Sequence, residues 1–176
     1  MNSNKLFTFV RLLISLSIIF AGSSVFAETT FEKIKRTGKV TVGTEAAFPP
    51  FEFVEDGKIV GYGKDILDYI VADMKVELNQ LDLPWQGILP GVLAGKFDFV
   101  ATSVSIRAER AKKYAFTVPI AEGTNWVMKR MGDTSIMSAD DLSGKVVCTQ
   151  LASASEKATQ EWEKDLKSRG LMYRIL

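Results

Sequence analysis

Short runs of alternating apolar and polar residues follow one another along this chain, separated by longer segments with an apolar residue at every third or fourth position. Strands are expected at residues 39–44, 51–54, 58–60, 76–81, 98–101, 125–129, 146–149 and 171–176. The dipeptide Asp56-Gly57 favours a tight hairpin turn between the second and third of these runs. Strands that alternate with helices predict an α/β fold with a mainly parallel sheet.

Helices are expected at residues 64–74, 87–94, 107–113, 138–142 and 154–169. In the first of them, one set of residues at helical spacing predicts the face that packs on a sheet. These residues are Ile66, Tyr69, Ile70, Asp73 and Met74.

The last of these helices has the clearest start. Ser153 and Glu156 match the capping box, in which each residue satisfies a backbone N–H of the other. The residues Ala158, Trp162 and Leu166 follow four apart and predict one buried face. Gly170 is the residue expected just after the helix end.

Residues 1–27 have the organisation of a cleavable export signal. Lys5 and Arg11 form a positively charged region before an apolar stretch at residues 12–22. Val25-Phe26-Ala27 then places small residues at positions −3 and −1 of a cleavage site. A membrane-spanning helix needs about 18 or more apolar residues, and this stretch is shorter. We therefore expect an exported chain that begins at Glu28.

Composition excludes several classes of chemistry. The 176 residues include no His and one Cys, and 22 basic residues balance 21 acidic ones. Without His there is no Ser-His-Asp or Cys-His nucleophile pair and no His-ligated zinc. A lone Cys forms no disulfide within the chain, and Cys148 is expected to be a small buried hydrophobe. A net charge of +1 argues against a nucleic-acid binder. From the composition as a whole, we expect no metal, no cofactor and no nucleic acid.

Four motifs follow one another between Glu28 and the last residue. They are residues 42–53 (VGTEAAFPPFEF), 61–66 (GYGKDI), 85–93 (WQGILPGVL) and 98–110 (DFVATSVSIRAER). In this order and spacing they resemble the family 3 bacterial extracellular solute-binding proteins, the amino-acid receptors of ABC import systems. Family members usually carry an acidic and then an apolar residue after the Gly-aromatic pair, where this chain has Gly63 and Lys64.

The resemblance implies a two-lobe periplasmic binding protein type II (Venus-flytrap) fold, with the ligand held between lobes that hinge strands join. Lobe 1 is expected at residues 28–122, without its C-terminal closing segment, and an incomplete lobe 2 at residues 123–176. We therefore expect a C-terminally truncated member of the family, which binds ligand weakly or not at all by itself.

The resemblance also implies a set of ligand-binding residues. They are Glu45, Phe48, Trp85, Ser103, Ser105, Arg110, Gln150, Ser153 and Ala154. Arg110 matches the carboxylate clamp, because a guanidinium offers two parallel N–H bonds to a planar anion. The alternative, judged from the residues alone, is a surface arginine paired with Glu109 or a neighbouring carboxylate.

The remaining matches divide by the part of the ligand they meet. Ser105 matches a backbone N–H donor to the ligand carboxylate, and Ser103 an oxygen that accepts from the ammonium group. Phe48 and Trp85 match the aromatic pair that sandwiches the aliphatic part of the ligand.

Four further positions concern the side chain and the carboxylate of the ligand. Glu45 and Gln150 match positions that read the side chain, where an acid favours a cationic or amide group. Ser153 and Ala154 open a helix, whose free N–H groups suit an anion. The turn before them lacks the glycines common in the family.

The resemblance implies the solute-binding component of an ABC transporter. We expect a periplasmic monomer that binds a polar or cationic amino acid and delivers it to a membrane permease, without catalytic residues. An alternative is a dehydratase of cyclohexadienyl or prephenate-type acids, which has the same fold and would need Glu45 as its general acid. A third interpretation is a truncated, non-functional remnant with an open sheet edge.

Overall fold

The computed structural model describes residues 27–171, 174 and 175, so the expected export signal lies outside the described residues except for Ala27. Of the described residues, those from 27 to 37 belong to one compact unit and those from Gly38 onward to another. No helix in the described part of the chain is long and apolar enough to cross a membrane.

Helix α2 (Thr30–Thr37) belongs to the first unit and was not predicted from the apolar pattern. Thr29 Oγ1 accepts a hydrogen bond from Glu32 N at 3.2 Å, and the Glu32 carboxylate accepts one from Thr29 N at 2.8 Å. This reciprocal pair is a capping box. The sequence signal Thr-x-x-Glu was therefore present and could have located this helix.

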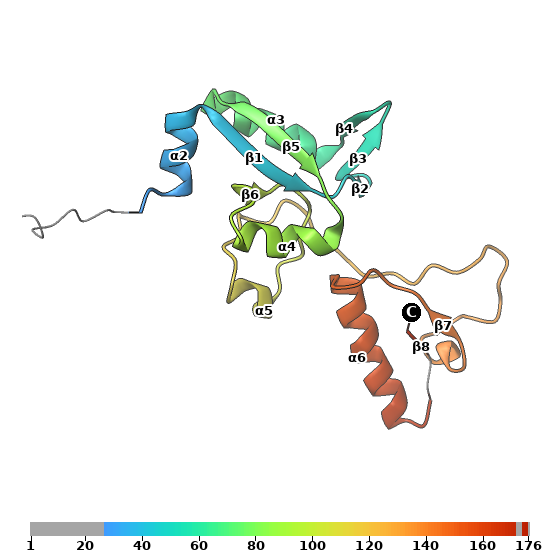
Figure 1. Cartoon of the computed structure of the whole chain (residues 1–176). Helices are drawn as coiled ribbons and strands as arrows, with labels where there is room; N and C mark the ends of the chain where they lie inside the picture. Colours follow the sequence, from blue (N-terminus) through green and yellow to red (C-terminus); the bar gives the residue numbers. More distant parts are fainter. Residues whose placement is uncertain (1–26, 172–173, 176) are drawn as a thin grey trace, which may run out of the picture. The chain divides into compact units, whose positions relative to one another are not determined.

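The second unit begins with a three-stranded sheet in which β1 lies between β5 and β6 (Figure 1). β1 (Lys39–Thr44) pairs in parallel with β5 (Glu77–Asp82) along its whole length, and with β6 (Phe99–Val100) through Val42 and Gly43. The parallel pairing confirms the predicted α/β class.

A small antiparallel sheet follows β1. It consists of β2 (Ala47–Phe48), β3 (Glu52–Glu55) and β4 (Lys58–Val60). Asp56 and Gly57 connect β3 to β4 with positive φ angles of 49° and 74°, as a type I′ hairpin turn requires. The predicted hairpin is confirmed.

Helix α3 (Tyr62–Met74) packs against β3 and β4 with a face that differs from the predicted one. Leu67 is buried, whereas Tyr69 is 77% exposed and Ile70 is exposed as well. Gly63, four residues before Leu67, lies directly against β3. The face of the helix that includes Gly63 and Leu67 is therefore the one that packs on the hairpin. The predicted face was wrong because apolar residues surround more than one side of this helix.

Helix α4 (Trp85–Leu93) begins two residues before the predicted start and packs on β1 and β6. The ring of Phe97, which is buried, fits where two glycines leave space. A Cβ atom added at Gly43 on β1 or at Gly91 on α4 would lie 2.6 Å from this ring. Both positions therefore require glycine if Phe97 is to stay between strand and helix.

The middle of the second unit has little regular structure. Helix α5 (Ala108–Ala111) is shorter than predicted, and residues 112–139 contain turns but no helix or strand. The strand expected at 125–129 was wrong. Trp126 is 85% exposed there, and no strand among the described residues supplies the backbone hydrogen bonds that a strand at 125–129 needs.

The C-terminal elements gather around a second hydrophobic cluster. They are the 3₁₀ helix η1 (Asp140–Leu142), β7 (Val146–Val147), α6 (Ala154–Ser168) and β8 (Arg174–Ile175). β7 and β8 pair in parallel. Leu142 and Leu166 are buried at the centre of the cluster, with Trp162 packed against them, which confirms the predicted apolar face of α6.

Cys148 is exposed, so its predicted burial was wrong. The prediction assumed a strand over 146–149, but β7 ends at Val147. The ladder with β8 therefore stops before Cys148, and the side chain is not enclosed by the sheet.

Candidate functional site

Buried polar contacts tie together the carboxyl ends of β1, β5 and β6. Thr44, the last residue of β1, is fully buried. Its hydroxyl donates to the carbonyl oxygen of Ala101 at 2.9 Å and accepts from Gln80 Nε2 at 2.9 Å. Ligands of open parallel sheets bind at this edge, so the segments that follow β1 and β6 are fixed where a ligand is expected.

The guanidinium of Arg110 connects three parts of the chain. Nη1 donates to the carbonyl oxygen of Ser105 at 3.2 Å, and Nη2 donates to that of Ala152 at 3.1 Å. The guanidinium carbon lies 5.3 Å from the ring centre of Trp85, which is a cation–π distance.

Arg110 is half-buried, and its surroundings favour an anionic ligand. Burial, and secondarily the positive charge of Arg107, lowers the pKa of Arg110 below its ordinary value. An arginine nevertheless stays charged at neutral pH, because that ordinary value is so high. In the described part of the chain, none of the ion pairs includes Arg110, although the sequence alone allowed a pair with Glu109.

The two candidate aromatic residues lie in different surroundings. Trp85 opens α4 and is 8% exposed, with the guanidinium of Arg110 at its ring. Phe48 is 47% exposed, and its ring centre lies 5.4 Å from that of Phe51 in a stacked arrangement. Phe48 therefore offers an open apolar surface, whereas Trp85 supports the guanidinium.

Glu45 and Gln150 contact each other directly. Gln150 Nε2 donates to Glu45 Oε1 at 2.6 Å, between residues 105 positions apart in the sequence. The structure thus brings together the two residues that were expected to read the ligand side chain.

Ser153 caps α6 as predicted, but the second bond of the predicted capping box goes to Ala152 N instead of Ser153 N. Ser153 Oγ accepts from Glu156 N at 3.0 Å, and the Glu156 carboxylate accepts from Ala152 N at 2.6 Å. Ala152 has a positive φ of 62°, a backbone conformation that favours glycine. The first N–H groups of a helix have no acceptor within it, so Ala154 N and Ser155 N remain suited to an anion.

Ser103 is held by a residue that sequence reasoning did not select. Its backbone N–H and its hydroxyl both donate to the Glu52 carboxylate, at 2.5 Å and 3.1 Å, and the Thr102 hydroxyl donates to the same group at 2.6 Å. Glu52 is 2% exposed. Glu52 alternates with Phe51 and Phe53, so the period-two pattern assigns it to the polar face of the strand and conceals its burial.

Arg107 makes a second link that sequence reasoning missed. Its Nε donates to Glu109 at 2.7 Å, its Nη1 donates to the carbonyl oxygen of Ala154 at 3.5 Å, and its Nη2 lies 3.8 Å from Glu161. Arg107 and Arg110 lie three residues apart on one helical turn, and this spacing was the available signal.

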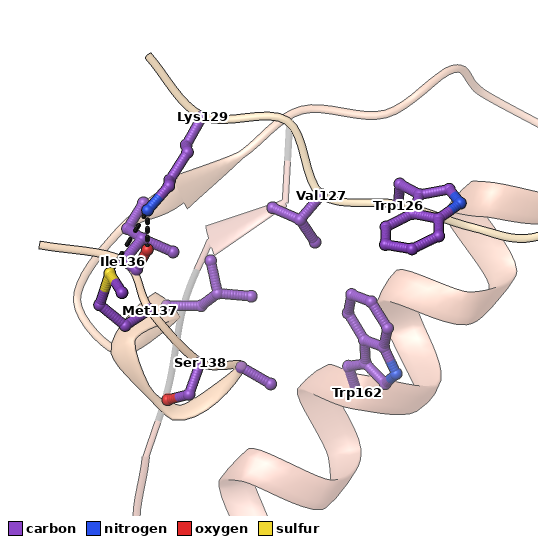
Figure 2. Close-up of a pocket in the computed structure, with 9 residues that line it drawn as sticks. Trp126, Val127, Lys129, Ile136, Met137, Ser138 and Trp162 are labelled. Atoms are coloured by element: carbon purple, nitrogen blue, oxygen red, sulfur yellow. Dashed lines mark hydrogen bonds between the residues drawn. The ribbon is translucent and has the colours of Figure 1, made fainter. Parts of the chain in front are cut away.

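A separate cavity of about 330 Å³ lies between residues 126–139 and α6. Figure 2 shows Trp126 and Trp162 at one end of it and Lys129 at the other. Lys129 Nζ donates to the carbonyl oxygen of Ile136 at 2.6 Å, so the charged lining group is already engaged. This cavity is mainly apolar and lacks the polar groups that Arg110 and its neighbours provide.

No group of three or more His, Cys, Asp or Glu side chains in the described part of the chain is arranged to hold a metal ion. The chemistry of the candidate site is therefore that of a guanidinium, a carboxylate, hydroxyls, backbone N–H groups and aromatic rings. Such a set can bind a small zwitterion.

Residues 40–172 match the family model of bacterial extracellular solute-binding proteins, family 3. The chain belongs to this family. The matched region contains all of the candidate site residues, and the recognition of this family from the four motifs is confirmed.

Individual relatives of this family 3 solute-binding protein are named as amino-acid-binding proteins. The L-cystine-binding protein TcyJ of Escherichia coli strain K12 is 34% identical over 144 residues, which cover 79% of this chain and 54% of the relative. A probable amino-acid ABC transporter-binding protein of Haemophilus influenzae is 28% identical over 94% of this chain and 62% of the relative.

Solved structures support the same fold for this solute-binding protein. An ancestral arginine-binding protein bound to arginine has a TM-score of 0.70 and 35% identity, covering 79% of this chain and 61% of that one. The ancestral amino acid-binding protein AncCDT-1 is described as a precursor of cyclohexadienyl dehydratase. It has a TM-score of 0.73 and 29% identity, and the match covers 84% of this chain and 64% of that one. The α/β periplasmic binding protein fold is confirmed. The chain spans about half to two thirds of the length of these relatives.

Proposed function

We propose that this family 3 protein is the solute-binding component of an ABC importer, exported to the periplasm, and that it binds an amino acid. The observation that carries the proposal is Arg110. Its half-buried guanidinium stacks on Trp85 and donates to the carbonyl oxygens of Ser105 and Ala152, without an ion-pair partner in the described part of the chain. A ligand carboxylate supplies the missing anion.

The proposed ligand position follows from the groups around Arg110. The carboxylate meets the guanidinium, the backbone N–H of Ser105 and the first N–H groups of α6, at Ala154 and Ser155. The N–H of Ser153 donates to the carbonyl oxygen of Gln150 at 3.2 Å, so Ser153 contributes as the cap of this helix. Charge-assisted bonds of this kind are about twice as strong as neutral ones. The ammonium group meets Ser103, and the exposed ring of Phe48 covers the aliphatic part of the ligand.

We further propose a polar or cationic ligand side chain. Glu45 is half-buried and accepts from Gln150 at 2.6 Å, so an acid and an amide are held side by side. A carboxylate in this place favours a guanidinium, ammonium or amide group. The relatives named for arginine and cystine, whose ligands have polar or cationic side chains, are consistent with this class.

Closure around the ligand is proposed to depend on contacts from two sides. We place lobe 1 at residues 28–122 and lobe 2 from residue 123. Arg110 and Glu45 then belong to one lobe, and Ala152 and Gln150 to the other. A ligand stabilises a closed state only by touching both sides, and a permease partner would recognise that state.

Two-dimensional NMR titration of the chain with L-arginine, L-glutamine and L-cystine tests the proposal, because it detects even millimolar binding. We expect saturable shifts of the backbone amides of Ser105, Arg110 and Ala154 with at least one of these amino acids, and none with D-glucose. Two outcomes would contradict it: shifts confined to other residues, or no shifts with L-arginine and L-glutamine at about 10 mM, tenfold above a millimolar dissociation constant, and with a saturated solution of L-cystine.

A dehydratase remains a second candidate, since AncCDT-1 is described as a precursor of such an enzyme. The reaction needs a general acid beside the leaving hydroxyl, and Glu45 is the carboxylate at the proposed ligand position. Spectroscopic turnover of prephenate that disappears in Glu45→Gln would support an enzyme. We expect no turnover with either protein.

A further inference from the structure

Glu52 on β3 is a buried carboxylate that accepts all of its hydrogen bonds from one turn. It is 2% exposed. Oε1 accepts from the Thr102 hydroxyl at 2.6 Å and from Ser103 N at 2.5 Å, and Oε2 accepts from the Ser103 hydroxyl at 3.1 Å. No ion pair in the described part of the chain includes Glu52.

Burial of a carboxylate is strongly unfavourable unless hydrogen bonds replace its water. Three donors of the Thr102-Ser103 turn supply that replacement, so the turn cannot move away without leaving a buried charge unsatisfied. The side chain of Glu52 therefore holds this turn at the carboxyl end of β6, beside the proposed ammonium position.

The carboxylate of Glu52 also determines in which direction the Ser103 hydroxyl donates its hydrogen bond. An ionised carboxylate only accepts, so the single hydroxyl proton of Ser103 points toward Glu52. The lone pairs of Ser103 Oγ are then left for another donor. We propose that Glu52 is a positioning residue that makes Ser103 a dedicated acceptor for the ligand ammonium group; this inference rests on the proposed amino-acid site.

Gly63 provides the space that this arrangement needs. A Cβ atom at position 63 would lie 2.6 Å from Glu52 Oε2 and 3.3 Å from the carbonyl oxygen of Phe51. Even a methyl group there would push on the carboxylate. Glycine at position 63 thus leaves room for the buried carboxylate of Glu52.

The decisive variant is Glu52→Gln, which keeps the shape but turns one oxygen into an NH₂ donor. The amide oxygen can still accept from Thr102 and Ser103 N, whereas the NH₂ group donates to Ser103 Oγ and turns the hydroxyl proton toward the ligand. A donor then faces the ammonium group. Titrations should compare L-arginine with 5-guanidinopentanoic acid, which lacks the ammonium.

We expect Glu52→Gln to weaken L-arginine binding about tenfold or more and to change binding of the ammonium-free analogue less than about twofold. Gly63→Ala should act in the same direction, whereas Gly87→Ala, where nothing lies within 4 Å of the added methyl, should leave both affinities unchanged. Equal weakening of both ligands by Glu52→Gln, or weakening of neither, would overturn the assignment.

Hydrogen exchange of the Ser103 amide separates this inference from the proposed function, because it needs no ligand. The amide should be protected in the wild type and in Glu52→Gln, and should exchange about tenfold faster or more in Glu52→Ala and Gly63→Ala. Unchanged exchange in both of these variants would refute the anchoring role. If none of L-arginine, L-glutamine and L-cystine bound while the Ser103 amide kept its normal protection, the amino-acid site and the ammonium role would be refuted, but not the anchoring.

Discussion

At the scale of single residues, the candidate site depends on charged side chains that neighbouring residues hold in place. Arg110 is oriented by two backbone carbonyl groups and the Trp85 ring, and Glu45 by the amide of Gln150. Residues held in this way lose little conformational freedom when a ligand binds. Specificity should therefore follow from the charge of these few side chains.

Glu45→Gln tests how the site selects the ligand side chain. Removing the negative charge should lower the affinity for L-arginine about tenfold relative to that for L-glutamine, because only the guanidinium of arginine gains from a facing carboxylate. Competitive titration of the two amino acids measures the ratio. An unchanged ratio would mean that Glu45 does not face the ligand side chain.

Asp141 leads to a prediction about acid stability. Its carboxylate accepts from the backbone N–H groups of Met137 and Ser138, at 2.9 Å and 2.8 Å, and from the Ser138 hydroxyl at 3.0 Å. The two backbone hydrogen bonds are the main cause that lowers the pKa of Asp141, followed by the hydroxyl. A carboxyl whose pKa is lower in the folded state adds stability above its unfolded pKa, and this stability is lost as the pH falls.

The wild type should therefore be more stable than Asp141→Ala at pH 7, and the difference should shrink below about pH 4. Urea unfolding at pH 7 and at pH 3 measures it. A difference that stays constant between the two pH values would show that these hydrogen bonds do not depend on the ionised carboxylate.

At the scale of elements, α4 contains a matched pair of glycines. A Cβ at Gly91 would lie 2.6 Å from the Phe97 ring, whereas one at Gly87 would meet nothing within 4 Å. Helix propensity favours Ala over Gly by about 1 kcal/mol at either position, but overpacking of a filled core is unfavourable by about 1–3 kcal/mol.

Gly87→Ala should therefore raise the free energy of unfolding by about 0.5–1 kcal/mol, and Gly91→Ala should lower it by about 1 kcal/mol. Chemical denaturation of both variants provides the measurement. If Gly91→Ala stabilised the chain as much as Gly87→Ala, the Phe97 ring would not occupy the space between β1 and α4.

The sequence predicted correctly those elements that are determined by residues close to one another in the chain. The hairpin at Asp56-Gly57 and the cap at Ser153 depend on residues within three or four positions. The strand expected at 125–129 failed because strand formation depends on a partner elsewhere in the chain. The prediction of the buried face of α3 was wrong for a similar reason. Contact with the hairpin, and not the apolar pattern of the helix itself, determines that Gly63 and Leu67 face inward.

At the scale of the whole molecule, the α/β fold could be predicted from alternating elements and motif order, but the contacts within the candidate site could not. The Glu45–Gln150 hydrogen bond joins residues 105 positions apart, and no periodicity encodes it. The burial of Glu52 was likewise hidden, because an acidic residue in a hairpin strand is ordinarily solvated. The proposed residue roles therefore came from the family resemblance.

The central claim is that Arg110 binds the carboxylate of an amino acid. Its most direct test is calorimetric or NMR titration of the wild type and Arg110→Lys with L-arginine and with L-argininamide, in which the carboxylate is replaced by a neutral amide. Lysine keeps the charge but loses the planar pair of N–H donors. We predict that the wild type prefers the acid about tenfold or more and that Arg110→Lys loses most of this preference. An equal preference in both proteins, or none in the wild type, would contradict the claim.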